Sequence, residues 1–416
     1  MKKKIFKPYH RTRLSYWNTI ATEWDSIKSD KAVVSTFLAV TIILLFVYAY
    51  VYSNEVIYDV PVALVNQDAT KTSRDYIEML DASAGIKTMT NFTDLQEAKH
   101  AYYSKKVMGI VIIPKDFEKN IRNGRPTAVS TYADASNMVF YKKVLGNVSI
   151  TNGYFNAGIG IKKSMAQGNP ITAAKQNQNP IQAISTSLFN TSSGYATYII
   201  PILTGLIIQL VIFMGIGILY GSRKEDKKIR TDFPRLLHKG GTIPVLLGKA
   251  SLYSIIFAVI IPIQIGIVFT IFSIPVRSSL LTIYAFLIPY IFSVVFLGIA
   301  ISSLFKRREE SIVFLVLISV PSLMLSGLSY PLEGFSLFYQ ALASIIPSTS
   351  GIEGFVKLTQ MHASLFEVTK EWLHLWGLTL LYFIIAAISL KIRAYNELQH
   401  LKNQHSILLI HHQKQH

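Results

Sequence analysis

ATYIIPILTGLIIQLVIFMGIGILY, residues 196–220, contains no formally charged residue. A helix of this length rises about 1.5 Å per residue and covers the roughly 30 Å of hydrocarbon in a bilayer. Five further stretches are similarly apolar and nearly free of charge: residues 32–52, 245–272, 280–305, 311–330 and 372–390. The composition agrees, since 50% of the 416 residues are hydrophobic and only 16% are charged. The sequence therefore predicts a polytopic α-helical membrane protein with six transmembrane helices.

The basic residues between the predicted spans indicate the orientation of the chain. Residues 1–31, 221–249, 306–310 and 391–416 together carry 23 Lys and Arg against 9 Asp and Glu. The other segments between spans carry 18 basic and 15 acidic residues. Because Lys and Arg accumulate in cytoplasmic loops, we expect both termini in the cytoplasm, including the tail 391–416. Residues 53–195 are then on the outer side.

Residues 53–195 alternate strand-like and helix-like patterns. Runs rich in β-branched residues predict strands at 59–68, 86–92, 107–114 and 127–136. Helical patterns cover 72–83, 93–106 and 138–166, with Thr93 as the candidate cap of the second. Asn, Gln and Pro are frequent from residue 167 to 180, which is typical of a linker. We therefore expect an inserted extracytoplasmic α/β domain with a long helix and a linker.

Residues 1–31 precede the first span and have an amphipathic pattern. Trp17, Ile20, Trp24 and Ile27 recur at helical spacing, which predicts a helix lying on the cytoplasmic face of the membrane. An extension of the first span is the alternative. The basic stretch MKKKIFKPYHRTR (1–13) favours contact with lipid or a subunit over nucleic acid, because the chain is so apolar. A solvated tail remains the third interpretation.

The loop 221–244 is the most polar cytoplasmic loop. Phe233, Leu236 and Leu237 have helical spacing just after Pro234, which suits docking on a soluble partner. A solvated loop that only carries the cytoplasmic positive charge explains the same residues equally well.

Residues 331–356 form two short amphipathic pieces interrupted by Pro331, Pro347 and Gly351. Neither piece is long enough to cross a bilayer alone. A re-entrant hairpin entering from the outer face fits the length, the helix breakers and the even number of spans. A loop lying at the interface is the alternative.

Motifs for nucleotide binding and hydrolysis are missing from the sequence. The nearest approach to a P-loop is Gly248-Lys249-Ala250, with Ile243 where the first glycine belongs and no hydroxyl for magnesium. HExxH and GxSxG do not occur, there is no cysteine, and the predicted spans contain no Asp or Glu that could relay protons. We therefore predict no catalytic, cofactor-binding or metal-binding residue, and expect the energy for any transport to come from another molecule.

Several segments together resemble the permease subunits of type-2 ATP-binding-cassette exporters, in the subgroup with a large outer domain after the first span. They are EWDSIKSDKA (23–32), VPVALVNQDATKTSRDYIEML (60–80), VMGIVIIPKDFEKNIRNGRP (107–126), TYADASN (131–137), PVLLGK (244–249), LSGLSYPLEGF (325–335) and IIPSTSGIEG (345–354). The resemblance covers essentially the whole chain. The family's Glu-rich stretch running into Gly-Thr is replaced here by RKEDKKIRTDFPRLL (223–237).

The resemblance implies a half-transporter that forms a homodimer or heterodimer above a separate pair of cytosolic ATPases, which hold ATP and magnesium. An interfacial helix then maps to residues 14–31, anchored by Glu23 and Asp25. A coupling helix maps to about residues 224–237. The implied ATPase contacts are Arg223, Lys224, Asp226, Phe233 and Arg235.

The re-entrant gate of the family maps to residues 331–356, with Pro331, Leu332, Phe335 and Pro347 as its candidate residues. The apolar spans suggest a hydrophobic or amphipathic substrate such as a lipid, a lipid-linked molecule or a drug. The implied location is the bacterial cytoplasmic (inner) membrane, in contact with membrane lipids and not with nucleic acid. A periplasmic adaptor is a further candidate partner if the host has an outer membrane.

Two other classes of function are compatible with the sequence. A membrane-anchored receptor or envelope assembly scaffold would use the outer domain to bind a ligand or a protein. An intramembrane enzyme is the weakest interpretation, because no acid, base and nucleophile converge in or beside the spans. Association with an ATPase, and stimulation of its hydrolysis, separates the exporter from the scaffold.

Overall fold

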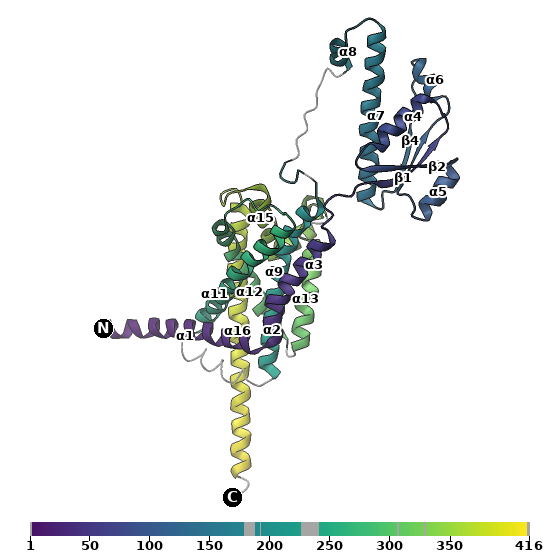
Figure 1. Cartoon of the computed structure of the whole chain (residues 1–416). Helices are drawn as coiled ribbons and strands as arrows, with labels where there is room; N and C mark the ends of the chain where they lie inside the picture. Colours follow the sequence, from purple (N-terminus) through teal and green to yellow (C-terminus); the bar gives the residue numbers. More distant parts are fainter. Residues whose placement is uncertain are drawn as a thin grey trace. The chain divides into compact units, whose positions relative to one another are not determined.

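The computed structural model describes residues 2–178, 188–191, 193–225, 241–305, 308–327 and 330–413. The contacts of the chain divide it into two units, one formed by Met1–Glu55 with Ser187–His416 and the other by Val56–Thr186. The first unit is helical and the second contains a β-sheet (Figure 1).

The helical unit begins with α1 (Lys2–Ser29), which Figure 1 shows running across the direction of the next helices. Helix α1 ends where Asp30 adopts an extended backbone conformation. The Asp30 carboxylate accepts hydrogen bonds from the N–H groups of Ala32 (3.0 Å) and Val33 (3.4 Å) and so caps the following helix. Helix α1 and the first span are therefore two separate helices.

The other described elements of this unit follow in chain order. They are α2 (Lys31–Ser35), η1 (Thr36–Val40), α3 (Thr41–Val51), α9 (Tyr195–Glu225), α11 (Thr242–Gln264), η2 (Ile265–Phe269), α12 (Leu280–Leu304), α13 (Arg308–Met324), η3 (Leu332–Gly334), α14 (Leu337–Ser344), α15 (Pro347–Met361) and α16 (Thr369–Gln413).

Within the described residues, five helical stretches are long and apolar enough to cross a membrane. They are Lys31–Val51, Tyr195–Tyr220, Thr242–Phe269, Leu280–Leu304 and Thr369–Arg393. Each overlaps one of the six predicted spans. The protein is thus a mostly helical, polytopic chain, and the number of membrane crossings depends on the remaining predicted span.

That remaining span, predicted at residues 311–330, is shorter in the structure. Helix α13 ends at Met324, and its apolar part is Ile312–Met324. Thirteen residues of α-helix cover about 20 Å, less than the roughly 30 Å of a hydrocarbon core. The helix stops because the chain turns at Gly327, whose φ of 80° is a left-handed conformation that suits glycine. The prediction of six full-length transmembrane helices is therefore not met by this segment.

Helix α9 forms the centre of the helical unit and packs against α3, α12, α13 and α15. Its residues Ile208, Val211, Ile212 and Phe213 are fully buried. A helix that is apolar all round and buried on all sides needs neighbours on every face, which explains why α9 carries no charge before its end. This central position makes α9 the common support for the elements of the candidate site.

Two π-helical segments, η1 and η2, interrupt the first and third predicted spans. In each, a threonine hydroxyl donates to the carbonyl oxygen five residues earlier: Thr41 to Thr36 at 3.3 Å and Thr270 to Ile265 at 3.4 Å. Such wide turns occur mostly as single insertions in α-helices and often lie at functional positions.

The second unit is built around a four-stranded sheet with the order β2-β1-β3-β4. Strand β1 is parallel to β2 and β3, and β3 is antiparallel to β4. The strands lie within the predicted ranges. Their bounds, and those of the helices, are β1 (Val60–Asn66), α4 (Lys71–Asp81), β2 (Ile86–Phe92), α5 (Leu95–Tyr103), β3 (Gly109–Ile113), α6 (Phe117–Arg122), β4 (Ser130–Ala133), α7 (Met138–Ala166) and α8 (Ile171–Gln178).

Each face of this sheet has its own apolar core. Val62, Leu64 and Val111 pack with α4, α6 and α7, while Ala63 and Val65 pack with α5 on the other face. This arrangement follows from the alternation of side chains along a strand. The cap of α5 differs from the prediction: Asp94, and not Thr93, accepts the hydrogen bond from the N–H of Glu97 (2.8 Å).

Asp81, at the end of α4, should make the stability of this unit depend on pH. Its carboxylate accepts hydrogen bonds from the N–H and the hydroxyl of Thr88, both at 2.7 Å, and these bonds hold the pKa of Asp81 below its ordinary value of 3.8. A carboxyl whose pKa is lowered by folding stabilises the protein above the unfolded pKa, and this contribution is lost as the pH falls through the folded pKa. We expect Asp81→Asn to lower the melting temperature more at pH 7 than at pH 3. A deficit that stays equal at both pH values would contradict this assignment.

Candidate functional site

Helix α1 lies against the start of α11 and presents two different faces. Ile20 and Ile27 point toward the bundle, and Ile27 is only 4% exposed, while Trp17 and Trp24 are 57% and 43% exposed. The four residues expected to form one apolar face therefore divide between two faces. The helices approach closely at Gly248, where a Cβ atom would lie 3.0 Å from the Tyr16 carbonyl oxygen. A side chain at this position would therefore require α1 and α11 to move slightly apart.

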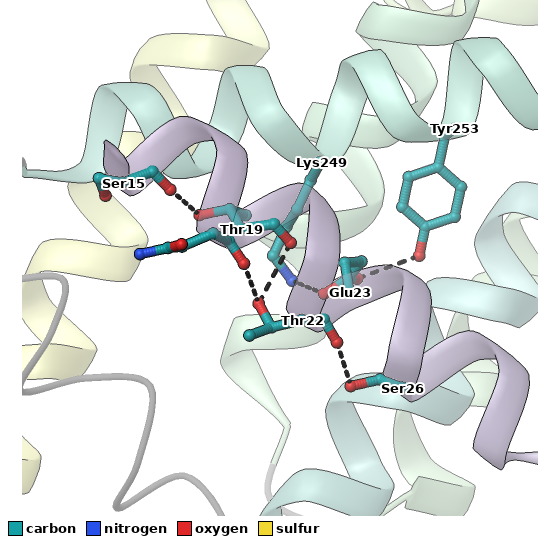
Figure 2. Close-up of polar contacts among 8 residues, drawn as sticks. Ser15, Thr19, Thr22, Glu23, Ser26, Lys249 and Tyr253 are labelled. Atoms are coloured by element: carbon teal, nitrogen blue, oxygen red, sulfur yellow. Dashed lines mark hydrogen bonds and ion pairs between the residues drawn. The ribbon is translucent and has the colours of Figure 1, made fainter. Parts of the chain in front are cut away.

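Glu23 forms a buried ion pair with Lys249 between these two helices. The Lys249 ammonium lies 2.7 Å from Glu23 Oε2, and the two side chains are 7% and 2% exposed. Tyr253, one turn further along α11, donates its hydroxyl to Glu23 Oε1 at 3.4 Å. Figure 2 shows both side chains reaching Glu23 from α11. Each charge offsets the burial of the other, since either charge alone at this depth would cost several kcal/mol.

Three other polar side chains of α1 in Figure 2 form hydrogen bonds within their own helix. Thr19 donates to the Ser15 carbonyl oxygen, Thr22 to that of Asn18 and Ser26 to that of Thr22, each at 2.8 Å. These bonds satisfy the hydroxyls within their own helix. Glu23 bonds to Lys249 and Tyr253 of α11, and Thr19 packs against α11 beside Gly248.

Two further helices join this ion pair through Tyr220. The Lys249 ammonium lies 4.7 Å from the centre of the Tyr220 ring, and the Arg393 guanidinium lies 5.6 Å from the same centre. Cations at these distances are attracted to the electron-rich face of an aromatic ring. We call the five residues the Glu23 cluster: Glu23, Tyr220, Lys249, Tyr253 and Arg393. It connects α1, α9, α11 and α16.

Two residues of the Glu23 cluster lie on either side of the loop 221–244. Tyr220 is the last residue of the apolar stretch of α9, and Lys249 lies in the second turn of α11. The loop predicted to meet a soluble partner runs between them. The Glu23 cluster therefore joins α1 to the two helices on either side of that loop.

The predicted coupling residues lie in three different settings: in the Glu23 cluster, on exposed or terminal parts of helices, and outside the described residues. Glu23 is in the cluster, whereas Asp25 is exposed and pairs with Lys28 of its own helix at 3.3 Å, which does not hold α1 to the bundle. Arg223 and Lys224 belong to the last turns of α9. Asp226, Phe233 and Arg235 lie outside the described residues.

Sequence reasoning missed Lys249 as the partner of Glu23. Its signal was present, because a lysine inside the apolar stretch 245–272 is costly unless it is paired. Tyr220 and Arg393 gave no such signal, since aromatic and basic residues are common at the ends of spans.

The predicted gate residues fall at two places. Pro331, Leu332 and Phe335 lie at and beside η3, where the Phe335 ring contacts that of Tyr330 at 5.5 Å between centroids. Pro347 is the first residue of α15 and is buried. The chain between these two places contains α14, which forms a hairpin with α15.

The start of α15 lies buried among the helices, whereas Ile345 at the turn of the α14–α15 hairpin is 48% exposed. The Tyr382 hydroxyl, from the middle of the α16 span, donates to the Ile345 carbonyl oxygen. Tyr290 of α12 donates its hydroxyl to the Gly205 carbonyl oxygen of α9 at 2.6 Å, and its ring fills the space left by Gly351 of α15. Side chains from α12 and α16 thus contact α15 and the turn before it.

The other end of α15 is held by charge. Lys357 bonds to Glu353 (2.7 Å) in its own helix and to Glu371 (2.8 Å) at the start of α16. Burial disfavours the charged form of Lys357, but its bonds to the two carboxylates outweigh burial and raise the pKa of Lys357 above its ordinary value. The hairpin is therefore fixed by an ion pair at one end of α15 and by neutral hydrogen bonds at the other.

Gln264, the last residue of α11, is a buried amide without a hydrogen-bond partner among the described residues. It is fully buried, and neither its nitrogen nor its oxygen is bonded. We expect Gln264→Leu to raise the stability of the purified protein by about 1–2 kcal/mol, because it removes two unsatisfied polar atoms. Gln209→Leu is the matched control and should lower it, since that buried amide is bonded. A lower melting temperature for Gln264→Leu would show that the amide has a partner.

The sequence matches the family described as ABC-2 family transporter protein over residues 31–388. This match covers most of the chain, and the protein belongs to that family. The resemblance to type-2 ATP-binding-cassette permeases is therefore confirmed. The chain is a multi-pass membrane permease of an ABC transporter, a family in which the ATPase activity is on a separate subunit.

Two relatives have the same printed name, "Probable multidrug ABC transporter permease YbhR". They come from Escherichia coli strain K12 and Escherichia coli O157:H7. Each is 20% identical to this chain over 365 residues, which are 87% of this chain and 93% of the relative. The match therefore includes both the helical unit and the sheet-containing unit.

Proposed function

We propose that the protein is the transmembrane subunit of an ATP-driven exporter for a hydrophobic or amphipathic substrate, such as a lipid, a lipid-linked molecule or a drug. ATP and magnesium would be held by a separate cytosolic ATPase, and two permease chains, identical or related, would form the transport path. The observation that carries this proposal is the Glu23 cluster, which joins both ends of the cytoplasmic loop to α1. The relatives' printed name supports a drug as one substrate class.

The proposed topology places both termini in the cytoplasm of a bacterial inner membrane and residues 53–195 outside it. The excess of Lys and Arg in the cytoplasmic segments supports this orientation. Five long spans alone would put the termini on opposite sides. We propose that α13 provides the sixth crossing, shortened because the α14–α15 hairpin occupies the outer part of the bilayer beside it. A periplasmic adaptor would then have access to the Val56–Thr186 unit.

The proposed mechanism has two states. Closure of the ATPase pair on ATP would push the loop 221–244, with Arg223, Lys224, Asp226, Phe233 and Arg235 at the contact. Because Tyr220 and Lys249 bind the ends of that loop to Glu23 and Arg393, α1, α9, α11 and α16 would move as one body. The tilt would open an outward path at the α14–α15 hairpin. Such a change needs only a small difference in the packing of rigid helices.

The decisive experiment is co-purification with a candidate ABC ATPase from the same organism, followed by reconstitution into liposomes. We expect a stable complex with vanadate-sensitive ATP hydrolysis and ATP-dependent movement of a fluorescent amphipathic dye. A permease that never associates with the ATPase would favour the scaffold function. Hydrolysis without dye movement would leave the exporter assignment standing only for another substrate class, which a panel of lipids and drugs would then test.

A further inference from the structure

A second polar cluster lies inside the bundle, apart from the Glu23 cluster. It consists of Gln209 in the middle of α9, Ser322 near the end of α13 and Ser348 at the start of α15, and all three residues are fully buried. The Ser348 N–H donates to Gln209 Oε1 at 3.1 Å, and Gln209 Nε2 donates to Ser322 Oγ at 3.2 Å. One amide therefore joins three helices.

Gln209 performs for α15 the role that a capping residue usually has. The residue before α15 is Ile346, whose side chain cannot accept a hydrogen bond, and Pro347 has no N–H to satisfy. The first N–H that needs an acceptor is that of Ser348, and the acceptor comes from another helix. The start of α15 is thus bonded to α9 through this amide and not through its own sequence.

The cluster is only partly satisfied in this arrangement. Ser348 Oγ is completely buried and has no hydrogen-bond partner among the described residues. A buried hydroxyl without a partner is destabilising, because it loses its hydrogen bonds to water and gains none in the protein. A polar network that is incompletely bonded and yet present in an apolar interior suggests a second arrangement in which its atoms find other partners.

We propose that Gln209 is a positioning residue that holds the buried start of α15 in the closed arrangement, and that its bond to Ser348 breaks when the α14–α15 hairpin moves. The direction of that movement rests on the proposed export function, whereas the closing role of Gln209 does not. Release exposes Ser348 Oγ and removes the amide that joins α15 to α9 and α13. Both bonds join neutral groups and are individually weak, so they can open and close repeatedly.

Because the chain has no cysteine, single cysteines can report on this release. Ser348→Cys places a thiol at a buried position whose hydroxyl makes no bond, so the exchange removes no hydrogen bond. We expect slow maleimide labelling of Ser348→Cys and labelling at least tenfold faster when Gln209→Leu is added. Gln209→Glu, which keeps an acceptor for the Ser348 N–H, should restore slow labelling. Equal rates in all three proteins would overturn the proposal.

Ser293→Cys is the matched control, since Ser293 is also fully buried but lies in α12, and its hydroxyl bonds to the Tyr290 carbonyl oxygen. Its labelling should be slow with either Gln or Leu at position 209. Parallel acceleration at both cysteines would mean that Gln209→Leu loosens the whole bundle, and would also overturn the proposal. With the ATPase present, ATP should accelerate labelling of Ser348→Cys alone. If only this last effect is missing, the export function fails and the role of Gln209 stands.

Discussion

Replacing Glu23 by alanine is expected to destabilise the helical unit by about 3–5 kcal/mol, because it leaves the Lys249 ammonium buried without its carboxylate. The expected result is a large drop in the melting temperature of the purified protein. The Tyr253 hydroxyl would lose its acceptor at the same time. The measurement is thermal unfolding in detergent, followed by fluorescence or by loss of the monodisperse peak.

Two further variants separate the charge from the position. Glu23→Leu combined with Lys249→Met removes both charges and fills the space, so it should recover most of the lost stability. Asp25→Asn is the matched control on the same helix, and it should change stability by less than about 1 kcal/mol because its ion pair is exposed. If the double variant is as unstable as Glu23→Ala, the cost lies in packing and not in the unpaired charge.

The double variant also bears on coupling. A stable protein without the ion pair should bind the ATPase but show weaker stimulation of hydrolysis by substrate, if the pair transmits movement from the loop to α1. Full stimulation in the double variant would restrict Glu23 and Lys249 to a structural role and would remove the observation on which the coupling proposal depends.

Replacing Gly354 by leucine is expected to displace α15 and abolish transport. A Cβ at position 354 would lie 2.1 Å from the tip of the Phe286 ring, which is itself fully buried in α12. Neither helix can yield without disturbing the packed interior, and overpacking of this kind commonly costs 1–3 kcal/mol or more. The readouts are the melting temperature and, with the ATPase, movement of dye into liposomes.

Gly377→Leu in α16 is the matched control. Gly377 is also a helical glycine, but a Cβ there meets no atom within 4 Å among the described residues. The same exchange should therefore leave the melting temperature close to that of the unaltered protein. A second variant, Phe286→Ala with Gly354→Leu, tests the contact itself. Replacing the Phe286 ring by a methyl group leaves room for the leucine side chain at position 354. Failure of this pair to recover stability would place the clash elsewhere.

The sequence was a good guide to features that depend on length and local pattern. The long charge-free runs predicted five of the apolar helices because a membrane selects for length, and β-branched runs predicted the strands because half-buried sheets favour those residues. It was a poor guide to which faces meet. Ile20 and Trp17 look alike in an amphipathic pattern, yet only the former packs against the bundle.

Pairings between distant residues account for most of what sequence reasoning could not supply. Glu23 and Lys249 are separated by 226 positions, and although Lys249 stands out inside an apolar run, nothing local indicates which carboxylate pairs with it. Gln209 was visible as an amide in an apolar run, but nothing local indicates that it bonds the start of α15. The short α13 was also missed, because the turn at Gly327 follows a run that remains apolar in composition.

The π-helical segments η1 and η2 have a consequence for how this chain tolerates changes of length. A wide turn already contains one residue more than an α-turn, so losing that residue would restore ordinary α-helix without rotating the flanking faces relative to each other. Elsewhere in a span, a one-residue deletion turns every following side chain by about 100°. A one-residue deletion within Thr36–Val40 or Ile265–Phe269 should therefore preserve the helix contacts on both sides of the deletion.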